Sequence, residues 1–117
     1  MVACSIDLIL NAEVSGTTPT FIGSARIITG SNSYISFRTM MGPSSDATAS
    51  LEVKRFTGGS SILELTASGI GLQDISGSTI TLPGPGVNIY DDWYDFYASG
   101  SASDVSGLIK GIRVILQ

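Results

Sequence analysis

Apolar and polar residues alternate along most of this chain, which is the period of a β-strand with one buried face and one solvent-facing side. The alternation predicts eight strands, separated by clusters of Gly, Pro, Ser, Thr and Asn that are typical of turns. Their predicted ranges are 3–14, 20–29, 34–41, 47–56, 62–67, 79–82, 88–98 and 108–116. No stretch has a clear helical period. The pattern predicts an all-β, antiparallel two-sheet sandwich of about eight strands, jelly-roll-like, forming a single domain over residues 1–117.

The predicted strand 88–98 is densely aromatic and contains the single tryptophan of the chain. A period of two residues puts Tyr94 and Phe96 on one face and Trp93 and Tyr97 on the other. Aromatic side chains bury large areas and favour strands, so we expect this segment to be a central strand. Core packing is the expected role of Trp93, and a subunit interface and a ligand-binding platform are the alternatives.

Alternation also assigns faces in the other strands. In strand 20–29 it places Phe21, Ala25 and Ile27 on one face and Arg26 on the other. The last strand, 108–116, is apolar on both faces apart from Lys110 and Arg113, so we expect it inside a sheet or against another subunit. Residues 68–79 are rich in glycine and are predicted to form a loop.

Charged residues make up 14% of the chain, against roughly 25% in ordinary soluble domains. So few charges cannot cover the surface, so part of it is expected to be buried in a homo-oligomer. The net charge is −4 and the basic residues are scattered, which argues against nucleic acid or an anionic membrane as a partner. No apolar run approaches the length of a membrane span.

The chain contains no histidine and one cysteine, which excludes Ser-His-Asp and Cys-His catalysis and zinc sites built from His or thiolates. No nucleotide-binding motif is present, so we expect neither an enzyme nor a cofactor. Asp91, Asp92 and Asp95 could bind calcium or cleave a glycosidic bond, but alternation separates Asp92 from the other two. We expect them to be solvated or paired with arginine, the candidate partners being Arg26, Arg38 and Arg113.

Several segments resemble the small jelly-roll virion proteins of tailed bacteriophages, namely capsid decoration (cement) proteins and fibre-head domains. They are the Ser/Thr/Gly-rich strands, the segments 49–53 (ASLEV) and 92–98 (DWYDFYA), and the last strand at 111–116 (GIRVIL). The resemblance implies a non-enzymatic structural protein, commonly a homotrimer attached to a capsid or fibre protein. It would be made in the host cytoplasm and located in the virion. The expected assembly contacts are Ile6, Ile109 and Ile115.

The alternative function is a carbohydrate-binding or receptor-binding module of a fibre tip. Trp93, Tyr94 and Asp92 are the residues expected to contact a glycan in that case. A glycan-cleaving enzyme that uses Asp91 and Asp95 is a third hypothesis.

Overall fold

The computed structural model describes residues 4–28, 32–55, 61–82 and 91–117, and these ranges contain nine strands and no helix. The strands are β1 (Cys4–Ser15), β2 (Thr20–Ile28), β3 (Tyr34–Pro43), β4 (Thr48–Arg55), β5 (Ser61–Ser68), β6 (Gln73–Ser76), β7 (Ile80–Thr81), β8 (Asp91–Gly100) and β9 (Ser106–Leu116). Within the described ranges, no helix has the length and apolar character needed to cross a membrane.

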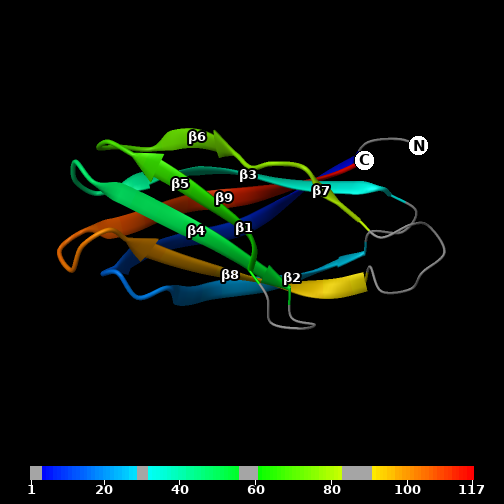
Figure 1. The fold of residues 1–117 in the computed structure, drawn as a ribbon, viewed down its shortest axis with the longest axis horizontal. Helices are drawn as coiled ribbons and strands as arrows, with labels where there is room; N and C mark the ends of the chain where they lie inside the picture. The colour runs from blue at the N-terminus through cyan, green and yellow to red at the C-terminus, as the bar shows by residue number, and fades with distance from the viewer. Residues whose placement is uncertain (1–3, 29–31, 56–60, 83–90) are drawn as a thin grey trace.

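The strands form two antiparallel sheets that pack face to face (Figure 1). The five-stranded sheet has the order β1-β9-β3-β6, with β7 also pairing with β3, and the four-stranded sheet has the order β2-β8-β4-β5. Most connections carry the chain from one sheet to the other, as between β1 and β2 or between β8 and β9. The predicted all-β, two-sheet antiparallel sandwich is therefore confirmed.

Both strands that were expected to be internal are internal. The aromatic strand β8 lies between β2 and β4, and the last strand β9 lies between β1 and β3. Aromatic side chains contact one another across the core between the two sheets. The centroid of the Phe37 ring on β3 is 5.9 Å from the centroid of the Tyr94 ring and 6.1 Å from that of the Phe96 ring, both on β8. All three side chains are buried. The apolar face of β8 thus supplies the centre of the core.

One strand lies in the region that was predicted to be a loop. β6 (Gln73–Ser76) pairs with β3 from Arg38 to Met41 and places Ile75 against the core. A strand of four residues with one inward apolar side chain is too short for alternation to be visible between glycines. The expectation of a loop over 68–79 is therefore wrong for these four residues.

Two irregularities change which side chains face outward. The register of β2 and β8 shifts between Phe21 and Gly23, so Phe21 lies opposite Tyr97 on the outer face while Ala25 and Ile27 face the core. The expectation that Phe21 shares a face with Ala25 and Ile27 is wrong, because one extra residue in a β-bulge reverses the alternation beyond it. The register of β9 with both of its neighbours, β1 and β3, also shifts at Gly111.

Candidate functional site

Three aromatic side chains lie on the outer face of the four-stranded sheet, and we call Phe21, Trp93 and Tyr97 the aromatic surface. Phe21 is 53% exposed and Trp93 is 47% exposed. The rings of Phe21 and Tyr97 meet edge to face, with centroids 5.7 Å apart. Phe21 and Trp93 therefore lie outside the core, and the aromatic surface is the first candidate for a binding site.

Polar groups lie beside these rings. Phe21, Ser24, Trp93 and Asp95 line a hollow of about 390 Å³. The ammonium group of Lys54 is 4.8 Å from the centroid of the Tyr97 ring, within the range of a cation–π contact. The surface therefore combines flat apolar faces with a hydroxyl and a carboxylate that can bind polar groups of a ligand.

The structure separates the residues that were expected to act together as a ligand platform. Trp93 faces solvent, so its expected place in the core is wrong. Tyr94, its neighbour on the strand, points the other way and is 1% exposed in contact with Phe37. The core accepts the face that carries Tyr94, Phe96 and Ala98. The backbone of Asp92 pairs with Ile27 of β2, and its side chain lies outside the described residues.

Two of the three arginines named as candidate partners of Asp91, Asp92 and Asp95 pair with other carboxylates, and pairing with Arg26 stays a prediction. Arg38 forms an ion pair with Asp74, and Arg113 with Asp7. Sequence reasoning missed Asp74 because β6 was not predicted. Among the described residues, no group of three His, Cys, Asp or Glu side chains is placed to hold a metal ion. The side chains of Asp91 and Asp92 lie outside that set.

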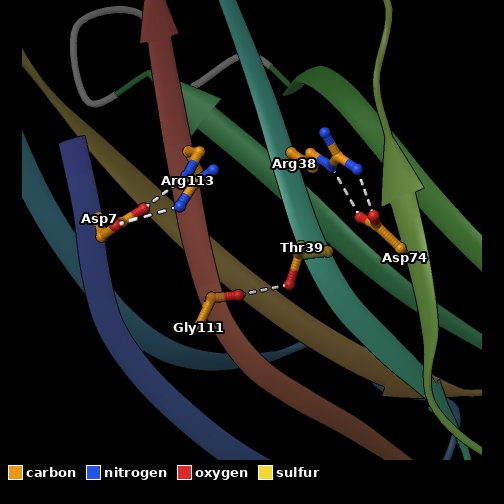
Figure 2. A network of polar contacts seen from close by, with 6 residues as sticks. All are labelled: Asp7, Arg38, Thr39, Asp74, Gly111 and Arg113. Atoms are coloured by element: carbon orange, nitrogen blue, oxygen red, sulfur yellow. Dashed lines mark hydrogen bonds and ion pairs between the residues drawn. The ribbon is translucent and has the colours of Figure 1, made fainter. Parts of the chain in front are cut away.

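A second hollow, of about 510 Å³, lies on the outer face of the five-stranded sheet, and we call it the charged groove. Its charged side chains are Asp7, Arg38, Asp74, Lys110 and Arg113. Figure 2 shows Asp7 and Arg113 on neighbouring strands, and Arg38 and Asp74 on the next two. The guanidinium groups of Arg113 and Arg38 turn away from each other, each toward its own carboxylate (Figure 2).

Both carboxylates of the groove are stabilised in their charged form. The hydrogen bond from Arg113, 2.7 Å from Nε to Oδ1, lowers the pKa of Asp7, and the hydrogen bonds from Arg38 lower the pKa of Asp74. The same contacts raise the pKa of each arginine. All four groups are exposed, so each pair adds little to stability.

Acidification is expected to weaken the fold slightly through these two carboxylates. The pKa values of Asp7 and Asp74 in the folded chain lie below the ordinary 3.8. Their contribution to the stability of the fold is therefore complete above pH 3.8 and is lost as the pH falls through the lowered pKa values. Thermal unfolding from pH about 6 to about 2 should show the Asp7→Asn/Asp74→Asn variant converging on the wild type in Tm as the pH falls. A difference in Tm that does not change with pH would contradict this role.

The three expected assembly contacts occupy different environments. Ile109 is 0% exposed, because its side chain faces the core from the middle of β9. Ile115 is partly exposed, and it pairs with Ser5 and Ser36 on the outer face. Ile6 is 38% exposed on β1, at one edge of the sheet. Of the three, Ile6 and Ile115 can reach a partner without opening the sandwich.

No protein-family model and no curated protein sequence matches this chain. Solved structures do match. The CBM36-1 domain of a multidomain xylanase from the hindgut metagenome of Trinervitermes trinervoides superposes with a TM-score of 0.69 and 8% identity, over 97% of this chain and 96% of that one. The carbohydrate-binding module CBM36 in complex with calcium and xylotriose superposes with a TM-score of 0.55 and 13% identity, over 89% of this chain and 98% of that one.

A viral capsid structure matches as well. The T13 particle of infectious bursal disease virus gives a TM-score of 0.56 and 10% identity over 98% of this chain, which spans 30% of the capsid chain. The fold is a jelly-roll β-sandwich. Identities this low show the fold alone. The expected resemblance to jelly-roll proteins is confirmed. The structures described above do not show a specific resemblance to the virion proteins of tailed bacteriophages.

Proposed function

We propose that this jelly roll is a non-catalytic carbohydrate-binding module that binds its ligand through the aromatic surface. The observation that carries the proposal is the position of Trp93. It lies half exposed beside Phe21, and Ser24 and Asp95 complete the same hollow. The faces of aromatic rings can pack on the C–H faces of sugar rings, while a carboxylate and a hydroxyl bind sugar hydroxyl groups.

The surroundings of the aromatic surface support a hydrated ligand over a protein partner. The centres of protein interfaces are depleted of charge, whereas Asp95 and the Lys54–Glu52 ion pair lie beside these rings. Trp93 and Tyr97 are four residues apart on one strand, which is about 13 Å. A ligand that contacts both rings is therefore an oligosaccharide rather than a single sugar. The CBM36 complex with xylotriose makes xylo-oligosaccharides the first probe.

Loss of Phe21 is expected to weaken glycan binding by about tenfold or more, since ring contacts at the centre of an interface carry much of its free energy. Titration with xylo- and cello-oligosaccharides can be followed by the fluorescence of Trp93, the single tryptophan, which the Phe21→Ala variant retains. Trp93→Ala, measured by calorimetry, should lose binding. Ile70→Ala, an exposed residue outside this surface, is the matched control and should bind as the wild type does.

The absence of binding to every glycan of the panel would refute the carbohydrate proposal. Equal affinity of the wild type and Phe21→Ala would refute the assignment of the site. Measurable turnover of any polysaccharide would contradict the non-catalytic role and return attention to Asp91 and Asp95.

A virion decoration (cement) protein, acting as a homotrimer on a capsid or fibre protein, is the second candidate. The observation in its favour is the exposure of apolar side chains on the five-stranded sheet: on the outer face, Ile9 is 88% exposed and Ile115 is partly exposed, and Ile6 is 38% exposed at the edge of the sheet. The capsid match supports it as a shared fold. Light scattering behind a sizing column gives the solution mass. A stable trimer would support this candidate, and a monomer at every concentration would contradict the homotrimer.

A further inference from the structure

The bulge at Gly111 brings two cations to the same face of the five-stranded sheet. In a regular strand, residues three apart face opposite sides, yet Lys110 and Arg113 are both exposed on the outer face. The reason is Gly111, whose φ of +79° lies in the region that favours glycine. The buried hydroxyl of Thr39 donates a hydrogen bond of 2.5 Å to the Gly111 carbonyl oxygen and holds the bulge in place (Figure 2).

Positive charge exceeds negative charge in the charged groove. Its three cations face two carboxylates, and those are engaged by Arg113 and Arg38. Lys110 forms no ion pair in the part of the chain that the structure describes. The groove is thus locally positive on a chain whose net charge is −4. An incoming anion would meet the ammonium group of Lys110 and the outer N–H groups of the neighbouring guanidinium.

Apolar side chains flank the same hollow. Ile9 on β1 and Met40 on β3 both line it and are exposed, although their surroundings are charged. Gly111 on the intervening β9 has no side chain, so it leaves the floor of the groove open between them. Two strand spacings, about 10 Å, separate β1 from β3. A hollow of about 510 Å³ falls within the usual size of small-molecule sites.

We propose that the charged groove binds a small amphipathic carboxylate. Its carboxylate accepts hydrogen bonds from Lys110 and Arg113, and its aliphatic part packs on Ile9 and Met40. Both halves of the ligand are needed, because a bare anion would leave the apolar walls exposed and a neutral aliphatic molecule would leave Lys110 without a counter-charge. This site lies on the sheet opposite the aromatic surface and does not depend on the carbohydrate proposal.

The test is a titration of the full chain with sodium hexanoate, followed by amide chemical shifts in two-dimensional NMR. Saturable shifts are expected at Ile9, Met40 and Gly111. Acetate, which lacks the tail, and hexanol, which lacks the charge, should each bind at least about tenfold more weakly. Lys110→Gln removes the charge, leaves a polar side chain that is one atom shorter, and should weaken hexanoate binding by a similar factor. Lys54→Gln, on the outer face of the other sheet, is the matched control and should leave it unchanged.

Three results would overturn the proposal. The first is the absence of saturable shifts with hexanoate in the wild type. The second is unchanged hexanoate affinity in Lys110→Gln, whose spectrum also reports whether the variant is folded. Binding of acetate as tight as that of hexanoate would also refute it, because the apolar walls would then play no part.

Discussion

Replacement of Ile109 by aspartate is expected to unfold the domain. The Ile109 side chain is fully buried in the middle of β9, where a carboxylate would have neither water nor a cation beside it. An unpaired buried charge of this kind costs several kcal/mol, about as much as the whole stability of a small domain. Circular dichroism and thermal unfolding of Ile109→Asp should therefore show no cooperative transition.

Ile115→Asp is the matched comparison on the same strand. Its side chain lies on the outer face, so the folded chain should lose no more than about 1 kcal/mol. If the protein is a homotrimeric decoration protein, the Ile115→Asp trimer should also dissociate into folded monomers, as measured by light scattering. A cooperative, wild-type-like transition in Ile109→Asp, or unfolding of Ile115→Asp, would show that the assignment of the two faces of β9 is wrong.

Phe96→Ala is expected to destabilise the domain by about 3–5 kcal/mol, the range for removal of a buried phenylalanine. Phe96 is fully buried on β8 and contacts Phe37 of the opposite sheet, with ring centroids 6.1 Å apart. Its removal opens a cavity between the sheets that the rigid backbones of two central strands cannot close. Chemical denaturation should show a lower midpoint with little change in the slope.

Tyr97→Ala is the control for this substitution. Tyr97 is the next residue on β8 but points outward, where it contacts Phe21 and Lys54. The variant should lose about 1 kcal/mol or less, because no internal cavity forms. Equal losses for Phe96→Ala and Tyr97→Ala would contradict the division of β8 into a core face and a surface face.

Much of the fold could be predicted because its main strands are long and alternate without interruption. In β4, Ala49, Leu51 and Val53 face the core as alternation predicts, and in β3 so do Ile35 and Phe37. The aromatic content of β8 predicted its central place, since large rings reach burial most fully between two neighbouring strands. The sequence does not predict which face of β8 points into the core, because each face carries aromatic side chains.

The candidate sites were harder to predict, since both depend on bulges. One extra residue near Gly23 turns Phe21 outward beside Tyr97, and Gly111 puts Lys110 and Arg113 on one face. A glycine inside a strand is a signal for a bulge, but the sequence does not tell which glycines form one. Asp74 escaped prediction for another reason: its strand, β6, has four residues.

The most direct test of the carbohydrate proposal is to map glycan binding on the chain by NMR, with xylotriose as the first ligand. The account predicts shifts of the indole Nε1–H of Trp93 and of the amides of Phe21, Ser24 and Asp95, with no change at Gly111 on the opposite sheet. If no glycan of the panel moves these signals, or if the shifts are confined to the charged groove, the aromatic surface is not a carbohydrate site.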